Sequence, residues 1–250
     1  MSAHVSLRTH RLLGIELVDA APEQVLLAVD SLVSRCAPSN VFFANAHTLN
    51  LASSDPHVAA ALARAAWVLN DGAGVALALR ARDIRVEYNL NGTDFLPRLL
   101  EYAATHGWSV FLLGGRPGVA ERARSALVTV TPQLNIVGTR DGFFDPRQSA
   151  DVVSEIRGSG ATMVLVAMGN PLQELWLDDH LTETGCRVGV GVGAFLDFAA
   201  GEVTRAPAWI RRARMEWFYR LAKEPRRMWQ RYVIGNPAFL VRSIREQWRL

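Results

Sequence analysis

The stretch WSVFLLGGRPGVAERARSALVTV, residues 108–130, joins a short apolar run to a helical pattern through a glycine-rich turn. A short apolar run that ends at glycines is typical of a buried strand, and the charged and apolar residues after it have helical spacing. The same order recurs in both directions along the chain, with apolar runs at 41–45, 67–70, 134–138, 162–169 and 187–193. Strands that alternate with helices indicate a mostly parallel sheet covered on both faces. The sequence therefore predicts an α/β fold of Rossmann-like type.

The bulk composition agrees with one large domain in a reducing compartment. Half of the 250 residues are apolar, which is enough for a substantial core. The two cysteines, Cys36 and Cys186, have neither metal-ligand spacing nor the density of a disulfide framework. The N-terminus lacks the apolar region of a signal peptide, and no run approaches the roughly 20 apolar residues that cross a bilayer. We expect a cytoplasmic protein whose membrane contact, if any, is peripheral.

Charge is distributed unevenly along the chain. From Arg205 to the end there are 12 basic and 3 acidic residues, which leaves 15 against 21 before it. Such asymmetry favours an anionic partner for the C-terminal part. We predict a Rossmann-like domain over residues 1–204 and a basic helical appendage over 205–250. Within the appendage, Pro225 is expected to interrupt a helix, and Asn236 is expected to cap a last one.

Ligands of parallel α/β sheets bind beyond the carboxyl ends of the strands, so polar residues there are the first candidates. Asp71 follows the apolar run 67–70, and its carboxylate could accept a proton from an attacking hydroxyl. A helix cap or a turn is the alternative role for Asp71. Asn45 ends the run 41–45 and is expected to face the crevice. His47 reads as an ordinary polar residue rather than a catalyst.

Three further junctions carry candidate ligand groups. The turn at Gly114 and Gly115 offers N–H groups and a helix start suited to phosphate. The alternative is that the two glycines serve only to form a tight turn. Gln173 has the spacing of a capping box with Asn170, and a ligand role competes with that structural one. Asn91 and Asp94 either cap a helix or bind sugar hydroxyls.

Several signatures of other protein classes are missing. The sequence contains no DxD, no GxSxG, and no His, Cys and carboxylate cluster with zinc spacing, which disfavours metal-dependent and serine-nucleophile mechanisms. It also lacks GxGxxG with an acidic residue about 20 positions later, so a dinucleotide-dependent oxidoreductase is disfavoured.

Taken in order, these motifs resemble one family. DGAGV (71–75), NGTDF (91–95), the GG turn, VAMGNPLQE (166–174), GVGAFLDFAAG (191–201) and the basic, aromatic segment 205–232 are similar to the successive motifs of the WecB/TagA/CpsF glycosyltransferases. This family is typified by the teichoic-acid N-acetylmannosaminyltransferase and the enterobacterial common antigen N-acetylmannosaminuronate transferase.

The resemblance implies an inverting, metal-independent transfer of a hexose-type residue from a UDP-sugar, which is a co-substrate, with no cofactor. The acceptor is a polyprenyl-diphosphate-linked sugar at the inner face of the plasma membrane, in cell-surface polysaccharide biosynthesis. By this resemblance Asp71 is the catalytic base, and Asn45 and Gln173 belong to the donor pocket. We expect the other donor contacts at Asn91, Asp94, Gly114, Gly115 and Asp197. The arginines expected to hold the lipid diphosphate or the membrane are Arg205, Arg212, Arg220, Arg227 and Arg231.

Two positions depart from the family pattern. Phe43 stands where members often have threonine, and Asn89 stands where many have arginine, for which Arg85 could substitute. Both departures bear on the identity of the donor sugar.

The appendage itself admits more than one interpretation. Arginine forks suit diphosphate oxygens, and Trp, Phe and Tyr settle at bilayer interfaces, which favours an anionic membrane surface as partner. Alternatively the aromatic residues pack on the main domain and the arginines are solvated. We expect both in part, with Trp217 and Leu221 facing inward and a subset of the arginines facing phosphate. Interleaved arginines and aromatics would also suit a nucleic-acid-binding protein. The acidic main domain and the lack of a nucleic-acid-binding motif argue against that rival, so we expect no nucleic-acid partner. A homo-oligomer is compatible with the sequence.

Overall fold

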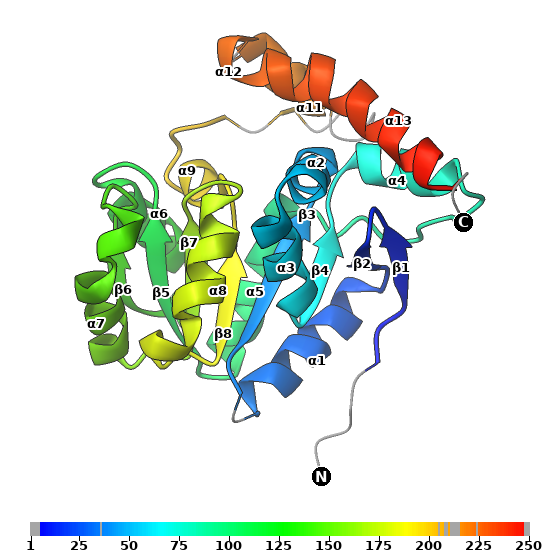
Figure 1. Ribbon diagram of the computed structural model, residues 1–250. Helices are drawn as coiled ribbons and strands as arrows, with labels where there is room; N and C mark the ends of the chain where they lie inside the picture. Colours follow the sequence, from blue (N-terminus) through cyan, green and yellow to red (C-terminus); the bar gives the residue numbers. More distant parts are fainter. Residues whose placement is uncertain are drawn as a thin grey trace.

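The computed structural model describes residues 6–35, 37–204, 206–207, 210, 216–223 and 225–247. In this part of the chain, eight strands form one sheet in the order β1-β2-β4-β3-β8-β7-β5-β6 (Figure 1). β1 is antiparallel to β2, and every other pair is parallel. The strands are β1 (Thr9–Leu12), β2 (Ile15–Val18), β3 (Ser39–Ala44), β4 (Trp67–Asn70), β5 (Ser109–Gly114), β6 (Asn135–Arg140), β7 (Met163–Ala167) and β8 (Val188–Gly191). The predicted mostly parallel α/β fold is confirmed.

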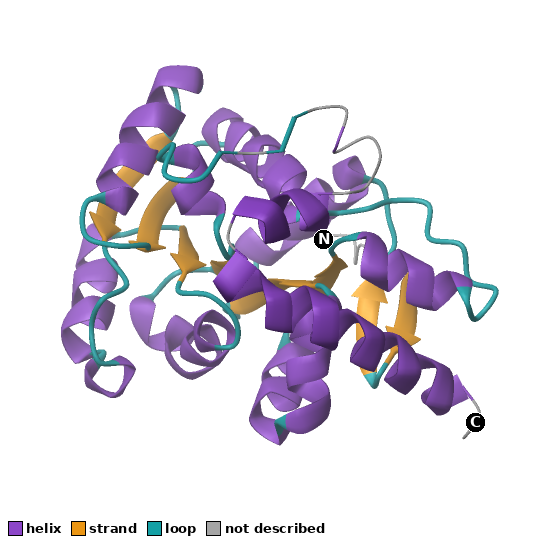
Figure 2. Cartoon of the chain, turned by 90° about the horizontal axis from the view of Figure 1, so that it is seen from above, coloured by secondary structure: helices purple, strands orange, loops and turns teal. Residues whose placement is uncertain are grey.

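Helices cover both faces of the sheet, as Figure 2 shows from above. Apolar residues of β3 alternate between two cores, with Val41 and Phe43 in one and Phe42 and Ala44 in the other. The first core is closed by α1 (Pro22–Val33), α5 (Gly92–Thr105), α6 (Val119–Val130) and α9 (Phe195–Ala199). The second is closed by α2 (Ala46–Ser54), α3 (Pro56–Arg64), α4 (Ala73–Arg80), α7 (Ala150–Ser159) and α8 (Leu172–Thr184), with the short η1 (Pro146–Gln148) before α7. Burial on both faces explains why the central strands are continuous apolar runs.

The C-terminal helices lie across the carboxyl edge of the sheet (Figure 1). They are α11 (Glu216–Lys223), α12 (Pro225–Trp229), the π-helix η2 (Gln230–Ile234) and α13 (Gly235–Gln247). α13 packs on α2 and α4, and Phe239 is fully buried in the second core. The appendage is therefore docked on the main domain along α13. The predicted boundary at 204 stays a prediction, since Arg205 lies outside the described residues.

Two expectations about the appendage are wrong. Asn236 does not cap a new helix, because η2 continues directly into α13. The Gly235 N–H reaches back five residues to the Gln230 carbonyl, and this wider turn allows Pro237 to follow without ending the helix. Trp217 does not face the main domain: it is 40% exposed and packs edge-on against Phe218 and Tyr232 within the appendage. Leu221 is half-buried. The predicted break stays a prediction, because Glu224, between α11 and Pro225 of α12, lies outside the described residues.

None of the helices in the described ranges is long and apolar enough to cross a membrane.

Candidate active site

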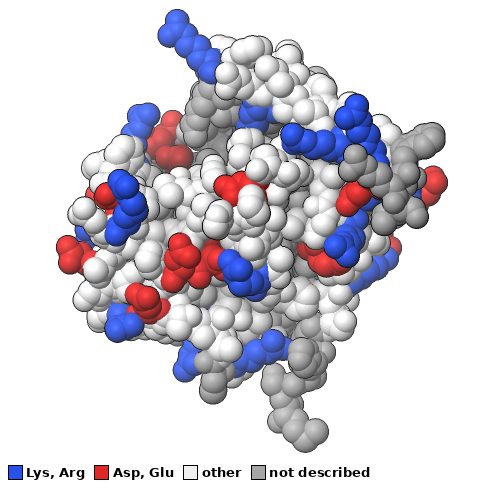
Figure 3. All heavy atoms as spheres, in the orientation of Figure 1, with Lys and Arg blue, Asp and Glu red and all other residues white. Residues whose placement is uncertain are grey.

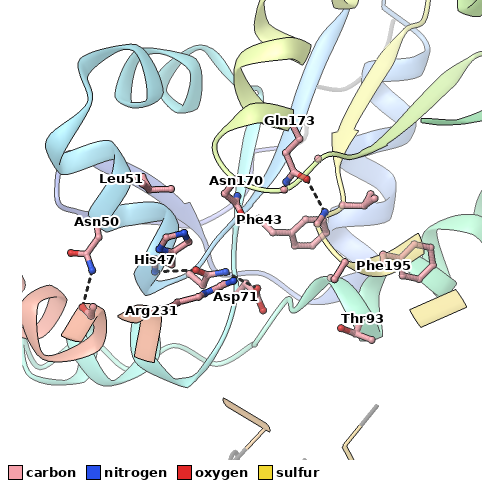
Figure 4. Close-up of a pocket in the computed structure, with 18 of the residues that line it drawn as sticks. Phe43, His47, Asn50, Leu51, Asp71, Thr93, Asn170, Gln173, Phe195 and Arg231 are labelled. Atoms are coloured by element: carbon pink, nitrogen blue, oxygen red, sulfur yellow. Dashed lines mark hydrogen bonds between the residues drawn. The ribbon is translucent and has the colours of Figure 1, made fainter. Parts of the chain in front are cut away.

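A pocket of about 630 Å³ opens where the carboxyl ends of β3, β4, β7 and β8 meet (Figure 4). The strand order changes direction here, since the chain leaves β3 for β4 on one side and returns at β8 on the other. Such a switch point is the usual ligand site of an open parallel sheet, and the volume suits a small molecule. The C-terminal helices contribute to its wall. Lining residues used below are Phe43, Asn45, His47, Asn50, Asp71, Thr93, Asn170, Gln173, Gly191, Gly193, Asp197, Arg231 and Arg242.

Asp71 lies in this pocket, directly after β4. Its carboxylate is half-buried, and Oδ2 accepts a hydrogen bond of 3.4 Å from Asn45 Nδ2. Asn45 caps α2, because its Oδ1 accepts from the backbone N–H groups of His47 (3.0 Å) and Thr48 (3.2 Å). This cap fixes which side of the amide carries the oxygen, so the NH₂ group must face Asp71. The N-cap of α4 is Gly72 with φ of 93°, so the alternative role of Asp71 as a helix cap is excluded.

The segment 87–90 holds the turn that carries Asp71. Asn89 Oδ1 accepts from the Gly72 N–H at 3.0 Å, and Leu90 N donates to the Asn70 carbonyl at 3.1 Å. The same segment is fastened below by Asp19, a carboxylate only 2% exposed that accepts from the N–H groups of Glu87 and Tyr88 at 3.1 Å each. Asn89, where the family has arginine, therefore supports the main chain, while Arg85 is exposed and does not line the pocket.

The opposite wall is built by the start of α8. Gln173 is 2% exposed; its Oε1 accepts from the Gly193 N–H at 3.0 Å, and its Nε2 donates to Glu174 Oε1 at 2.9 Å. The predicted capping box is wrong, because Pro171 occupies the N-cap position and no side chain caps the helix. The side chain of Gln173 points inward, where it bonds both the Gly193 N–H and the buried carboxyl group of Glu174. In this dry setting those two bonds are more valuable than a bond at the solvated helix start.

Burial perturbs two titratable groups beside the pocket. The pKa of Glu174 is raised to about 7, because burial disfavours its charged form more than the bonds from Gln173 and Asn170 favour it. The pKa of His47 is lowered to about 4, first by burial and then by the positive charge of Arg231. His47 is therefore a neutral imidazole at pH 7, and the charge on this side of the pocket belongs to Arg231.

The C-terminal helices bring two guanidinium groups to the pocket. Arg231 enters from η2 (Figure 4), and Arg242 of α13 also lines the pocket. Arg242 Nη1 donates to Asn50 Oδ1 at 2.7 Å, and Asn50 Nδ2 donates to the Gly235 carbonyl at 2.7 Å. Asn50 of α2 thus ties α13 to the rim. Neither Asn50 nor Arg242 was predicted from the sequence to be a site residue.

Some predicted site residues lie outside this pocket. Gly114 and Gly115 end β5, where Gly115 N donates to the Ala167 carbonyl at 3.0 Å and a Cβ on Gly114 would overlap the backbone of Ala167. Close strand packing therefore explains Gly114, while at Gly115 φ is 73° and a Cβ would overlap the Val119 side chain of α6. Asn91 and Asp94 bond each other, with Asn91 Oδ1 accepting from Asp94 N at 3.0 Å, and cap α5. Thr93 between them does line the pocket, as does Asp197.

Of the predicted appendage arginines, Arg231 reaches the pocket. Arg205 and Arg212 lie outside the described residues, and α11 and α12 include Arg220 and Arg227, whose side chains are not described. Phe43, in place of the family threonine, is buried at the pocket floor and packs against Phe95 with ring centroids 6.2 Å apart. Within the described ranges there is no group of three or more His, Cys, Asp or Glu side chains that could hold a metal ion.

A polar pocket at the switch point of a parallel sheet, with one held carboxylate and two guanidinium groups, defines a class of α/β enzymes that act on small anionic substrates. The chain belongs to the glycosyl transferase WecG/TagA/CpsF family, whose model matches residues 10–250. The resemblance seen in the motifs is confirmed over nearly the whole chain. The protein is thus a glycosyltransferase with a role in cell-surface polysaccharide synthesis.

Proposed function

We propose that the protein is an inverting transferase that moves a hexose-type residue from a UDP-sugar to a polyprenyl-diphosphate-linked sugar, without a metal ion or cofactor. The observation that carries the proposal is the position of Asp71, whose carboxylate accepts from Asn45 in a pocket that Arg231 and Arg242 of the C-terminal helices also line. The family supports a nucleotide-sugar donor and a lipid-linked acceptor in general.

In this proposal Asp71 is the general base. A sugar hydroxyl is a poor nucleophile, so a positioned carboxylate must take its proton while the new glycosidic C–O bond forms. The bond between the anomeric carbon and the UDP oxygen breaks on the opposite face of the sugar, which inverts the configuration. UDP leaves with the bonding electron pair, and the proton remains on Asp71 until solvent removes it.

The negative charge that develops on the β-phosphate needs cationic partners. Arg231 and Arg242 both line the pocket, and guanidinium groups bind phosphate oxygens through two parallel hydrogen bonds. Neutral His47 beside Arg231 adds no second positive charge. The apolar floor at Phe43 offers the donor no hydrogen bond there, so the donor sugar should present an apolar face or a methyl-bearing group to it.

The appendage suits peripheral attachment to the inner face of the plasma membrane. Its described large apolar side chains that remain exposed are Trp217, Phe218, Trp229, Val233, Ile234, Val241 and Ile244. Lys223 and Arg226 are exposed among them, and Figure 3 shows basic side chains at the top of the molecule, over these helices. Aromatic residues insert at the headgroup level, and each basic residue near anionic lipid contributes on the order of 1 kcal/mol.

The decisive experiment compares Asp71→Asn with the wild type. The variant should lose about 10²–10⁴-fold in turnover on a lipid-diphosphate acceptor, the usual contribution of a general base, while calorimetry still detects UDP binding. Asp151→Asn, an exposed aspartate on α7, is the matched control and should keep wild-type turnover. Near-normal turnover in Asp71→Asn would refute the assignment.

Two further assays define substrate and partner. A panel of UDP-sugars, scored by thermal stabilisation and then by transfer, identifies the donor. Sedimentation with anionic liposomes, but not with single-stranded DNA, is expected if the appendage binds membranes; the reverse result would favour the nucleic-acid alternative.

A further inference from the structure

A fully buried carboxyl group lies directly behind the pocket wall. Glu174 is 0% exposed and does not itself line the pocket, but its two polar neighbours, Asn170 and Gln173, do. A buried acid is costly and is usually compensated by several hydrogen bonds. Here only Oε1 is used: it accepts from both Asn170 Nδ2 and Gln173 Nε2, whereas Oε2 has no hydrogen-bond partner among the described residues. Stability alone gives no reason for such an arrangement.

The geometry has a direct effect on the two pocket amides. An amide can present either its oxygen or its NH₂ group in a given direction, and only its partners decide which. Because Glu174 Oε1 accepts from both, the NH₂ groups of Asn170 and Gln173 must both turn inward. The oxygen of Gln173 then receives the Gly193 N–H at 3.0 Å, and the oxygen of Asn170 is left on the pocket side.

The same contacts fix the loop after β8. Gln173 packs so closely on Gly191 that a Cβ there would lie 3.0 Å from Nε2, and Gly193 is bonded to Oε1. Gly191 and Gly193 both line the pocket. One carboxyl oxygen therefore sets the hydrogen-bonding pattern of one wall and, through Gln173, the position of the adjoining loop.

We infer that Glu174 is a positioning residue for the donor: through Oε1 it holds the amides of Asn170 and Gln173 so that the wall presents the Asn170 oxygen as an acceptor to a nucleoside diphosphate sugar. The inference rests on the proposed function for the identity of the ligand. Without Glu174 the two amides lose their common acceptor and can rotate, so the wall no longer offers a single pattern of donors and acceptors.

The test uses two substitutions of similar volume in the full-length protein, with UDP and the best UDP-sugar of the panel as probes. Glu174→Gln keeps an acceptor oxygen at Oε1 and places an NH₂ group at the partnerless Oε2 position. Glu174→Met fills the same space without an acceptor. We expect calorimetric affinity for the UDP-sugar to fall by about tenfold or more in Glu174→Met, the effect of one lost hydrogen bond in a buried site. Glu174→Gln should stay within about threefold of the wild type.

Rescue by glutamine separates positioning from bulk stability. Equal affinity in Glu174→Met and the wild type would overturn the inference, and so would a loss in Glu174→Gln as large as that in Glu174→Met. Should Glu174→Met fail to unfold cooperatively, Glu174→Asp replaces it, since a shorter side chain withdraws the acceptor from both amides and should weaken binding in the same way. A wild-type protein that binds neither UDP nor any UDP-sugar would instead refute the proposed function.

Discussion

The buried carboxyl group of Glu174 should make the stability of the protein fall as the pH rises. In the folded chain its pKa is raised to about 7, chiefly by burial, against an ordinary value of 4.5. Between these two values the folded protein keeps a proton that the unfolded chain has released. Stability therefore decreases with increasing pH in this window and becomes constant above it.

The magnitude follows from the two pKa values. One unit of pKa difference corresponds to about 1.4 kcal/mol, so ionising Glu174 in the folded state costs on the order of 3 kcal/mol in total. At about pH 5.5, one unit above 4.5, on the order of 1 kcal/mol of this is already lost. About 2 kcal/mol more should be lost between about pH 5.5 and about pH 8.

The assay compares urea unfolding of the wild type and Glu174→Gln, followed by tryptophan fluorescence, at several pH values. Glutamine has the shape of the protonated acid and does not ionise, so the stability of Glu174→Gln relative to the wild type should grow by about 2 kcal/mol across that range. The control is Glu183→Gln: Glu183 is an exposed residue of the same helix, so this variant removes one charge from α8 without changing a buried group. A difference between Glu174→Gln and the wild type that stays constant with pH would show that this carboxyl group is not desolvated.

Three other perturbations test the fold and the docking of the C-terminal helices. Gly114→Ala should lower the free energy of unfolding in urea by about 2 kcal/mol or more, because φ is 131° and the new Cβ meets the Ala167 backbone. The control is Gly158→Ala in α7, whose Cβ meets nothing within 4 Å and which should be neutral or slightly stabilising. Arg82→Ala removes bonds to the Ser243 carbonyl (2.6 Å) and Glu246, so hydrogen exchange along α13 should accelerate, while exposed Arg80→Ala leaves it unchanged. The pKa of His47 is lowered to about 4, so the stability that this residue contributes above about pH 6.5 is lost as the pH falls. His47→Asn does not titrate there, and its melting temperature should fall less than that of the wild type over the same pH range. Identical pH profiles of the two proteins would contradict this prediction.

The architecture could be predicted from the sequence because the apolar runs, the glycines that bound them and the helical spacing that follows all indicate the same fold. Apolar runs such as 162–169, bounded by glycine and followed by helical spacing, permit few structures other than buried parallel strands. The positions of Asp71 and Asn45 follow from the same pattern, since side chains at the carboxyl ends of neighbouring parallel strands meet at one edge. That rule places them together without any knowledge of the side-chain contacts.

Hydrogen-bond partners could not be predicted in the same way. Gln173 has the spacing of a capping box, yet its oxygen accepts from Gly193, twenty residues along the chain, because its side chain is buried and faces that loop instead of the solvated helix end. Asp19 and Glu174 went unnoticed, since a single carboxyl residue in an apolar context gives no signal in the sequence. Gly114 shows how one pattern can have two causes: a glycine turn suggests phosphate, but the close approach of β7 also leaves no room for a side chain at this position.

The path of Arg231 into the pocket explains why the arginines of the appendage cannot be assigned from a helical wheel. Arg231 and Phe239 are eight residues apart, and eight steps of about 100° would place them about 80° apart on a regular α-helix. The π-helix η2 takes up one residue, which shifts the phase by about 100° and brings the two side chains to nearly the same side. Phe239 is buried against the main domain, so Arg231 must also face it, toward His47 and the pocket. A single turn with the wider bonding pattern thus turns Arg231 away from the exposed face of the C-terminal helices and toward the pocket.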